Sequence, residues 1–492
     1  MSKEEISSGE EEGGGDFWDE VIDLTEPEKE ENNYTFVENG KVYTLSRDQS
    51  YAMKRAVMDR ANVFITGGAG TGKSFLLKAI RSELSHQSKA INIGVVAPTG
   101  IAAVNVGGAT VNSFFGLGLA DQPVEDYIKR IKKFKPLRER ITTLDVLMIE
   151  EVSMISANLF EMVDTVMKKI RRRLDEPFGG CQVIIFGDFY QLKPVNPNTE
   201  KGKIYCFESN VWVHTVSEVV ILEDGYRQRD KDFYELLNRI RIGEMGKPDE
   251  EILRKRIGVN IEADGIKPTK LCPHKVSVSD INTKELDALP LPEKIYRSKL
   301  SICTGRSKKS EQQIEDLVYK SCTAEKELRL RIGAQVMLIF NVSVEKDLVN
   351  GSRGIVTGFS QIGYPIVKFA SGTTRVIEEL DWNFGSQFEG WSATLTAIPL
   401  ILAWSVTIHK SQGSTLDKMV IQEMDKVFGE GMLYVALSRA RNLDGLSLGP
   451  TKYFKVVVNP SVKKFYQELM EKKENKRSST GNIQSYFKKQ KL

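Results

Sequence analysis

Four apolar runs in the first half of the chain are typical of buried β-strands. They are NVFITG from Asn62, INIGVVAPTG from Ile91, VLMIEE from Val146 and QVIIFGDF from Gln182. Their apolar residues are consecutive rather than alternating, which is the pattern of parallel strands covered on both faces. Helical patterns separate them. The sequence therefore predicts an α/β fold whose polar strand ends meet at one edge of a sheet.

The second half of the chain changes pattern twice. Another α/β region starts near VVILEDGYRQ and returns at LILAWSVTIHKSQG and MLYVALSRA. Between its two parts, residues 331–398 form short apolar runs divided by Gly, Asn and Ser turns. That spacing predicts a small β-barrel inserted into the second α/β region.

Composition limits the class of protein. A chain of 492 residues is long enough for about two to four domains. The five cysteines are scattered without a CxxC pair or zinc-ligand spacing, which favours reduced thiols. No apolar run approaches about 18 residues, and the N-terminus is too acidic for a targeting peptide. We therefore expect a soluble protein of the cytosol or nucleus.

Charge is distributed unevenly along the chain. Residues 1–31 hold thirteen Asp or Glu and two Lys, whereas the whole chain has a net charge of +3. The remaining residues are therefore strongly basic, which suits a polyanionic partner such as nucleic acid. The acidic segment is too poor in apolar residues to build a core, so an unfolded arm is expected over residues 1–40.

The octapeptide GGAGTGKS, residues 67–74, fits the phosphate-binding P-loop pattern G-x-x-x-x-G-K-[ST]. It follows a predicted strand and leads into a predicted helix, which is the context that the motif requires. The glycines let backbone N–H groups face phosphate oxygens at a helix N-terminus. We expect ATP to bind here, with Lys73 reaching its β and γ phosphates and Ser74 ligating Mg²⁺. The backbone of the loop contributes Gly68, Gly70, Thr71 and Gly72.

Two adjacent acids end the strand VLMI. A P-loop site needs one acid to hold Mg²⁺ and another to activate the attacking water. Glu150 is predicted to take the first role, which Asp fills more often, and Glu151 the second. At the end of the next strand, Gln191 is expected to sense the γ-phosphate and Asp188 to brace the metal shell. Arg227 and Arg439 are candidates for stabilising the charge of the phosphoryl-transfer transition state.

These residues together resemble the Pif-family DNA helicases, the superfamily-one group related to RecD and to the Dda helicase of a bacteriophage. The resemblance runs from about Leu45 to Leu448. It includes LSRDQ, GGAGTGKS, APTGIAA, TVNSFFGLG, EEVSM, PFGGCQVIIFGDFYQLKPV, YRQ, LVNGSRGIV, AWSVTIHKSQGSTL and YVALSRA. The departures are Glu150, where the family usually has Asp, and Lys193, where a second proline is common.

The resemblance implies two RecA-like domains with ATP between them, an SH3-like barrel inserted in the second, and a wedge at about residues 115–140. It also implies 5′→3′ translocation on single-stranded DNA and nucleotide-binding roles for Gln49 and Gln412. The expected boundaries are 41–222 for the first domain, 223–330 and 399–470 for the two parts of the second, 331–398 for the barrel, and 471–492 for a basic tail.

Single-strand binding requires phosphate contacts and faces on which bases can stack. Three motif loops offer both kinds of group. The predicted DNA-binding residues are Thr99, Ser113, Phe114, Phe115, His409, Lys410, Ser411 and Thr415.

Both terminal segments carry short motifs. DEVIDLTE in the acidic arm resembles a SUMO-interacting motif, with Val21, Ile22 and Leu24 as the added strand. Near the C-terminus, Ile483, Tyr486 and Phe487 fall on one helical face and resemble the sliding-clamp motif of replication proteins, although Thr480 stands where that motif has Gln. A chance apolar patch and a basic import signal or DNA tether are the respective alternatives.

The sequence leaves two other classes of function open. One is a P-loop enzyme of another type, such as a small-molecule kinase or a GTPase, but no N-K-x-D guanine motif is present. The other is a non-catalytic DNA-binding or scaffold protein in which Glu150 has ended hydrolysis. A helicase acting in the nucleus, or at a viral or cytoplasmic replication site, remains the preferred interpretation.

Overall fold

The structure is a computed structural model that describes most of the residues between 34 and 472. The acidic residues up to 33, most of the basic tail and both terminal motifs lie outside the described residues, whereas residues 35–38 form a β-strand, so the arm predicted over residues 1–40 was given too late an end. Within the described part, no helix has the length and apolarity needed to cross a membrane. The description omits residues 1–33, 39, 89, 119, 195–201, 229, 262–264, 306–308, 323, 341, 343–347, 349–350, 387–389, 428 and 473–492.

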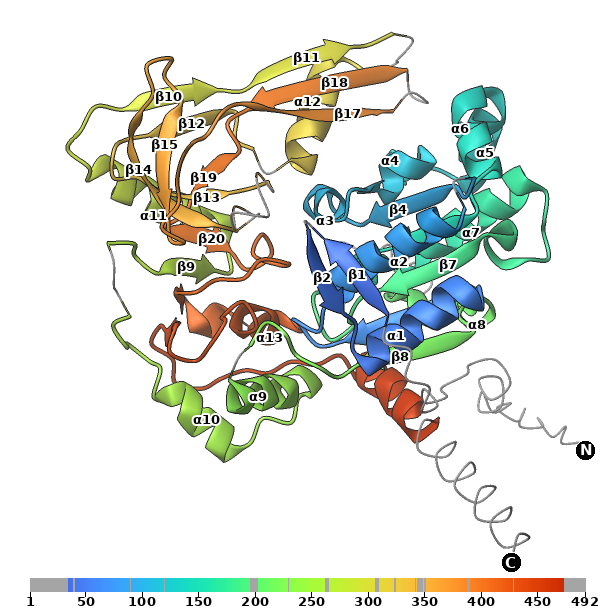
Figure 1. Ribbon diagram of the computed structural model, residues 1–492, viewed down its shortest axis with the longest axis horizontal. Helices are drawn as coiled ribbons and strands as arrows, with labels where there is room; N and C mark the ends of the chain where they lie inside the picture. Colours follow the sequence, from blue (N-terminus) through green and yellow to red (C-terminus); the bar gives the residue numbers. More distant parts are fainter. Residues whose placement is uncertain are drawn as a thin grey trace, which may run out of the picture.

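A six-stranded parallel sheet forms the centre of the first domain, on the right of Figure 1. Its strand order is β5-β4-β6-β7-β3-β8, and every neighbouring pair is parallel. The consecutive apolar residues of the four predicted strands fill β3, β4, β6 and β7. The strands are β3 (Val63–Gly67), β4 (Ile93–Ala97), β5 (Ala109–Thr110), β6 (Val146–Ile149), β7 (Gln182–Phe186) and β8 (Glu218–Leu222).

Helices cover both faces of this sheet, which is why its strands are apolar throughout. Val63 and Ile65 of β3 pack with the helices on one face, and Phe64 packs with those on the other. One face carries α1 (Arg47–Met53), the π-helical turn η1 (Lys54–Met58) and α2 (Lys73–Gln87). The other carries α5 (Val124–Lys133), α6 (Lys135–Thr142), α7 (Ala157–Arg171) and α8 (Asn210–Thr215).

Shorter elements join these layers. The hairpin of β1 (Thr35–Glu38) and β2 (Lys41–Thr44) packs Phe36 and Tyr43 against Phe75 of α2, with ring centres 5.4 and 5.3 Å apart. The other short helices described in this domain are α3 (Gly100–Asn105), α4 (Val111–Phe115) and the 3-10 turns η2 (Val152–Met154), η3 (Pro177–Gly180) and η4 (Cys206–Glu208). The 3-10 turn η6 (Met424–Lys426) belongs to the second domain.

The segment predicted as a wedge folds largely into α5 and α6. Tyr127, Ile128 and Ile131 of α5 enter the core of the first domain, while Lys129 and Lys132 are exposed. The helix pair is therefore amphipathic, with a basic outer face that projects from the first domain.

A second parallel sheet, β20-β9-β21-β22, forms the core of the second domain. Its strands come from distant parts of the chain, since β9 is Thr269–Cys272 and β20 is Ser405–Thr407. The others are β21 (Met419–Ile421) and β22 (Leu446–Leu448), and the associated helices are α9 (Lys231–Ile242), α10 (Lys247–Arg254), α11 (Lys275–Asp287) and α13 (Met432–Leu437).

The inserted region is built mainly of antiparallel strands, and it begins earlier than predicted. β10 pairs with β12, and β11 pairs with β18, so residues 294–330 belong with the insertion rather than with the second domain. The boundary predicted at residue 331 is therefore too late, and the one predicted at residue 398 is too early, because residues 400–402 pair with residues 336–338 of the insertion. The insertion contains β10 (Lys294–Arg297), β11 (Lys299–Cys303), α12 (Glu311–Ser321), β12 (Glu327–Leu330), β13 (Gln335–Leu338), β14 (Arg353–Phe359), β15 (Pro365–Phe369), β16 (Thr374–Val376), β17 (Leu380–Ser386), β18 (Trp391–Ala397) and β19 (Leu400–Leu402).

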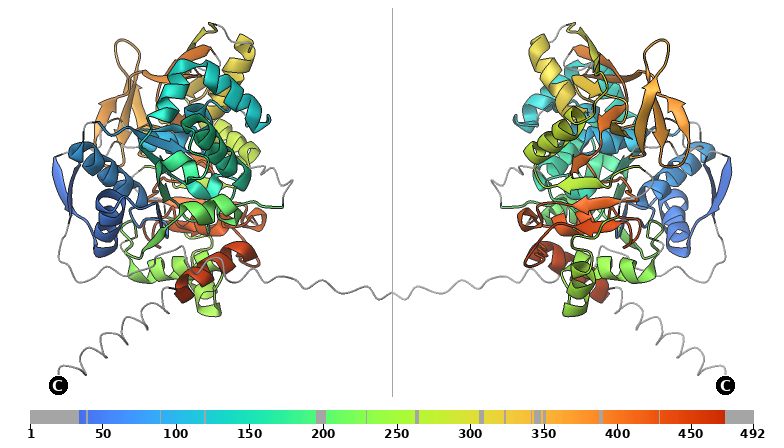
Figure 2. Two further views of the ribbon diagram at one scale, coloured as in Figure 1. Left: turned by 90° about the vertical axis from the view of Figure 1, so that its right-hand side faces the viewer. Right: turned by 90° about the vertical axis from the view of Figure 1, so that its left-hand side faces the viewer.

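The last described helix, residues 460–472, returns to the first domain. Val462, Phe465, Tyr466 and Leu469 are buried in the same core as Phe64 of β3. The prediction that the second domain runs to residue 470 is therefore wrong for this helix. Figures 1 and 2 show it as a red helix at the bottom of the molecule, beside α9.

Candidate functional site

The P-loop joins β3 to α2 at the edge of the first sheet. Gly70 and Gly72 have φ angles of 88° and 84°, in the left-handed region that glycine adopts without strain. A Cβ on Gly70 would also lie 2.5 Å from the Cβ of Arg227. Thr71 Oγ1 donates to the carbonyl of Gly68 at 3.0 Å and closes the loop. The P-loop held in this way forms one wall of a pocket of about 940 Å³.

Lys73 lies at the first turn of α2 and folds over the loop. Its Nζ donates to the carbonyl oxygens of Gly67 at 2.8 Å and Gly68 at 2.9 Å. Burial lowers the pKa of the Lys73 ammonium group, while the charges of Asp188, Glu151 and Glu150 oppose that shift. The ammonium group thus stands at the mouth of the phosphate loop with acids around it, where a triphosphate would replace the carbonyls as its partner.

Glu150 meets Ser74 directly across the sheet edge. The Ser74 hydroxyl donates to Glu150 Oε1 at 2.5 Å, and Glu150 Oε2 has no hydrogen-bond partner in the described part of the chain. The side chain is buried, and burial together with the charge of Glu151 raises the pKa of Glu150 to about 7. A hydroxyl and a carboxylate with an unpaired oxygen fit Mg²⁺, which prefers oxygen ligands shared with phosphates.

Replacing Glu150 with Gln is expected to raise the melting temperature of the nucleotide-free protein more at pH 8 than at pH 5. The pKa of Glu150 rises from an ordinary 4.5 to about 7 on folding, so the folded state holds the proton more tightly. Stability is therefore lost as pH rises between these two values, and a neutral amide does not titrate. Thermal unfolding at both pH values measures the difference. Glu468→Gln, at a partly exposed position on the helix 460–472 where Glu468 pairs with Lys464, is the control. An equal shift at both pH values would contradict the assigned pKa.

Glu151 stands in a backbone conformation that non-glycine residues rarely adopt. Its φ and ψ angles are 51° and 47°, in the left-handed region. Such strain is found preferentially at functional sites. Glu151 Oε2 accepts a hydrogen bond from Nε2 of Gln412 at 3.3 Å, which links the first domain to the loop after β20. The strand end thus aims Glu151 into the space between the domains.

Gln412 and Gln49 occupy different places around the loop. Gln412, predicted to bind the cofactor, reaches Glu151 in this structure. Ser46 caps α1, and its N–H donates to Oε1 of Gln49 at 3.1 Å, while Nε2 of Gln49 donates to the carbonyl of Thr71 at 3.4 Å. A Cβ on Gly72 would lie 2.8 Å from that nitrogen, so Gln49 lies tightly against the P-loop.

Asp188 forms an ion pair with an arginine of the second domain. It follows β7, and both carboxylate oxygens bind the guanidinium group of Arg241, at 2.8 and 2.9 Å. Burial acts to raise the pKa of Asp188, yet the charge and hydrogen bonds of Arg241 outweigh it and the pKa is lowered. Asp188 is thus held by Arg241, and its role in bracing the metal shell stays a prediction. Gln191 donates to Asp188 Oδ2 at 3.4 Å and lines the pocket.

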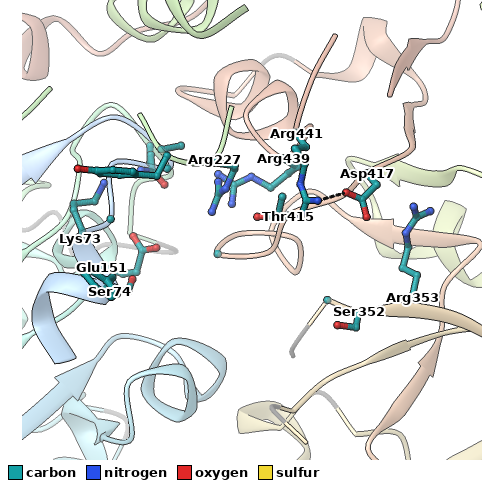
Figure 3. Close-up of a pocket in the computed structure, with 18 of the residues that line it drawn as sticks. Lys73, Ser74, Glu151, Arg227, Ser352, Arg353, Thr415, Asp417, Arg439 and Arg441 are labelled. Carbon is teal, nitrogen blue, oxygen red and sulfur yellow. Dashed lines mark ion pairs between the residues drawn. The ribbon is translucent and has the colours of Figure 1, made fainter. Parts of the chain in front are cut away.

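Arg227 and Arg439 lie opposite the P-loop. Figure 3 shows both side chains across the pocket from Lys73, Ser74 and Glu151. Arg227 donates to the carbonyl of Ser438 at 3.2 Å. Arg439 is 1% exposed, and burial, with the charge of Arg227, lowers the pKa of Arg439 to about 9. In this conformation Arg439 donates to main-chain carbonyls, including that of Val435 at 2.9 Å.

The predicted DNA-binding residues of the first domain divide into surface and core. Ser113 is exposed, and Thr99 Oγ1 accepts from the N–H of Ala102 at 3.3 Å at the start of α3. Phe114 is half-buried, with the guanidinium carbon of Arg140 5.5 Å from its ring centre. Phe115 is fully buried in the core. The prediction that Phe115 stacks on a base is therefore wrong, because its ring faces the sheet.

The predicted DNA-binding residues in the loop after β20 also include both exposed and buried side chains. His409 and Lys410 are exposed, and Thr415 lines the pocket. Ser411 is 1% exposed, and its hydroxyl donates to the carbonyl of Ile408 at 2.7 Å. The side chain of Ser411 is thus a structural link within the loop, which corrects its predicted contact with DNA.

Several residues that line the pocket were not predicted, including Tyr226, Arg353, Asp417 and Arg441, and neither were two residues that lie behind it. The hydroxyl of Tyr434 accepts from the N–H of Ala69 at 2.6 Å, and Arg241 holds Asp188. A signal for Arg241 is present in the sequence, since it lies four residues after the buried Leu237 and so on the apolar face of α9. A charged residue on that face needs a buried partner.

This chain is similar to known proteins over most of its length. Residues 44–251 match the family model described as PIF1-like helicase, and residues 316–359 match that of the DNA helicase Pif1 2B domain. The chain is 38% identical to the ATP-dependent DNA helicase PIF1 of Danio rerio, over 86% of this chain and 64% of that protein. It thus spans a little less than two thirds of the length of that curated relative.

Two solved structures are similar over most of their length. The Pif1 helicase from Candida albicans is 34% identical, with a TM-score of 0.73 over 86% of this chain and 99% of that one. The Bacteroides Pif1 helicase bound to ADP-AlF3 and single-stranded DNA is 30% identical, with a TM-score of 0.62 over 87% and 97%. These likenesses cover both sheets and the insertion between them. The chain belongs to the PIF1-like helicase family.

Proposed function

We propose that this chain is an ATP-dependent DNA helicase that moves 5′→3′ on single-stranded DNA and unwinds duplex or structured DNA in replication, repair or recombination. One observation carries the proposal: a single pocket is lined by the P-loop, Glu150 and Glu151 of the first domain and by Arg227 and Arg439 of the second. Closing such a pocket on a nucleotide moves one domain against the other. The Bacteroides relative was solved with both a nucleotide analogue and single-stranded DNA.

ATP and Mg²⁺ are the cofactors that these residues suit. Lys73 and the P-loop amides would hold the phosphates, while Ser74 and Glu150 would hold the metal. When bound, the metal would offset the negative charge of the phosphate oxygens. Glu151 would accept the proton of the attacking water. Gln191, in the turn that follows β7, would sense the γ-phosphate by contacting it.

Movement along DNA follows from alternating grip by the two domains. ATP draws Arg227, Arg439 and Gln191 together and closes the cleft, and hydrolysis reopens it, so the nucleotide must bind the two states with different affinity. Exposed His409 and Lys410 on the second domain and Ser113 on the first would contact the strand. The inserted antiparallel strands form the proposed SH3-like barrel, and α5 with α6 forms the proposed wedge.

Strand displacement tests both activity and direction. Forked substrates with only a 5′ or only a 3′ single-stranded tail are mixed with the protein, ATP and Mg²⁺, and released strand is measured. Unwinding of the 5′-tailed substrate alone is expected. Unwinding from the 3′ tail would reverse the direction, and absence of DNA-stimulated ATP hydrolysis would favour the non-catalytic DNA-binding alternative.

Replacing Arg227 with Ala is expected to lower kcat for DNA-stimulated ATP hydrolysis by about 100-fold or more while changing the Kd of ATP much less. A transition-state cation stabilises charge that the bound substrate does not yet carry. Steady-state kinetics and nucleotide titration measure the two quantities. Arg254→Ala, on the surface of α10, is the control, and a change in KM alone would make Arg227 a substrate-binding residue.

The two terminal motifs are proposed to recruit partners. Deleting residues 478–492 is expected to abolish binding to a sliding clamp without altering DNA-stimulated ATP hydrolysis, and Tyr486→Ala with Phe487→Ala is expected to do the same with the charge unchanged. Clamp binding retained by the double variant would leave only an electrostatic tether.

For the SUMO motif, a peptide of residues 15–30 is titrated with SUMO, and no binding at about 1 mM would end that proposal. A nuclear site of action is proposed, and a fluorescent fusion locates it.

A further inference from the structure

A buried ion pair joins the two domains behind the nucleotide pocket. Arg241 of α9 donates to both carboxylate oxygens of Asp188, at 2.8 and 2.9 Å. The side chain of Asp188 is fully buried and that of Arg241 is 13% exposed. Asp188 follows β7 of the first sheet, whereas α9 packs into the core of the second domain. The pair therefore crosses the domain boundary without lining the pocket itself.

Asp188 also holds the turn that carries Gln191. Its Oδ1 accepts from the N–H of Tyr190 at 3.2 Å, and its Oδ2 accepts from Nε2 of Gln191 at 3.4 Å. The carbonyl of Asp188 accepts from the N–H of Gln191 at 2.9 Å. Oδ2 of Asp188 thus accepts hydrogen bonds from both Arg241 and the side-chain amide of Gln191. A movement of the guanidinium group therefore changes the hydrogen bond that Oδ2 offers to the Gln191 amide.

Two aromatic rings fix the direction of Arg241. Tyr190 and Tyr466 are stacked, with ring centres 4.6 Å apart, and the guanidinium carbon lies 4.7 and 5.3 Å from them. The Tyr466 hydroxyl lies 2.7 Å from Thr66 Oγ1, next to the P-loop, and accepts from the N–H of Phe189 at 3.2 Å. The helix 460–472 therefore closes the cluster from outside.

α9 touches the P-loop as well as the turn. A Cβ on Gly68 would lie 3.3 Å from Oδ1 of Asn238 and 3.9 Å from Cδ of Arg241. A buried Arg–Asp pair seldom adds stability over apolar residues of the same volume, but it does enforce one geometry. Because the pair lies between the P-loop and the turn that carries Gln191, it fixes the position of that turn relative to the P-loop.

We propose that Arg241 is a positioning residue through which the second domain sets the direction of the Gln191 side chain toward the nucleotide. Rotation of the second domain carries α9 and its guanidinium group, Asp188 follows, and the amide of Gln191 turns with it. Domain closure and arrangement of the γ-phosphate contacts are then one event. This inference rests on the proposed ATP hydrolysis.

The test compares variants of two arginines on the same helix. Arg241→Met removes the positive charge and the two-donor guanidinium group, whereas Arg241→Lys keeps the charge alone. Arg239→Met is the matched control, because Arg239 lies outside the pocket and pairs with Asp249 at 2.8 Å. DNA-stimulated kcat, the Kd of ATP and the melting temperature are measured for each. Arg241→Met is expected to lower kcat by about 10- to 100-fold with the Kd changed less than about threefold, and Arg241→Lys to recover part of the rate.

A double variant separates positioning from folding. Arg241→Met with Asp188→Asn removes both buried charges, so the melting temperature is expected to recover while kcat stays low. Recovery of kcat together with the melting temperature, or an unchanged kcat in Arg241→Met, would overturn the inference. A wild-type protein without DNA-stimulated ATP hydrolysis would instead overturn the proposed function. A fall of equal size in Arg239→Met would also overturn the inference, since it would assign the effect to α9 as a whole.

Discussion

Replacing Lys73 with Ala is expected to reduce ATP hydrolysis by at least about 100-fold, with the fold retained. The Lys73 ammonium group is positioned by the carbonyls of Gly67 and Gly68 at the mouth of the P-loop. It is the P-loop cation placed to meet the charge that develops on the β and γ phosphates. The Lys73 side chain is half-buried and lines the pocket, so its loss enlarges the pocket rather than the hydrophobic cores.

Steady-state hydrolysis with saturating single-stranded DNA measures the effect, and circular dichroism checks the fold. Lys78→Ala is the matched control, because Lys78 lies on the same helix and pairs with Glu38 at 2.9 Å. Hydrolysis at the wild-type rate in Lys73→Ala would remove the P-loop from the mechanism.

The substitution Glu151→Gln is expected to slow hydrolysis by about 100- to 10,000-fold while ATP and single-stranded DNA remain bound together. The replacement amide has nearly the same shape and can still accept a hydrogen bond from Gln412. It cannot take a proton from water at neutral pH. Binding therefore survives and the chemical step does not.

Co-retention of labelled ATP and DNA on a filter, followed over time, detects the trapped complex. Glu468→Gln supplies the control for a lost negative charge. Rapid release of phosphate by Glu151→Gln would show that another group activates the water, and loss of ATP binding would assign Glu151 to the metal or the phosphates.

The strands and the P-loop could be predicted from the sequence because their causes are local. The run from Val63 to Gly67 is buried on both faces, and the glycines after it are needed for φ angles that other residues avoid. The approach of Glu150 to Ser74 also follows, since parallel strands bring their ends to one edge.

Contacts between distant segments could not be predicted in this way. Phe114 and Phe115 are adjacent and chemically identical, and only the orientation of α4 on the sheet decides which ring enters the core. The partner of Asp188 lies 53 positions away, on a helix of the other domain. The start of the insertion was missed because β11 pairs with β18 across a long stretch of chain.

The apolar stripe of Val462, Phe465, Tyr466 and Leu469 illustrates the same limit. Its spacing is that of an amphipathic helix. Nothing in the spacing says which of two domains the stripe will cover, because both present apolar surface.

The return of the helix 460–472 to the first domain has a consequence for synthesis on the ribosome. The sheet of that domain is complete once β8 has emerged, but Phe207 stacks on Phe465, with ring centres 4.4 Å apart, and Trp212 packs beside them. At about 5–20 residues per second, this aromatic surface waits tens of seconds for its cover. The domain translated first is therefore expected to be finished last, and a premature stop codon before residue 460 would release a chain with that surface exposed to aggregation.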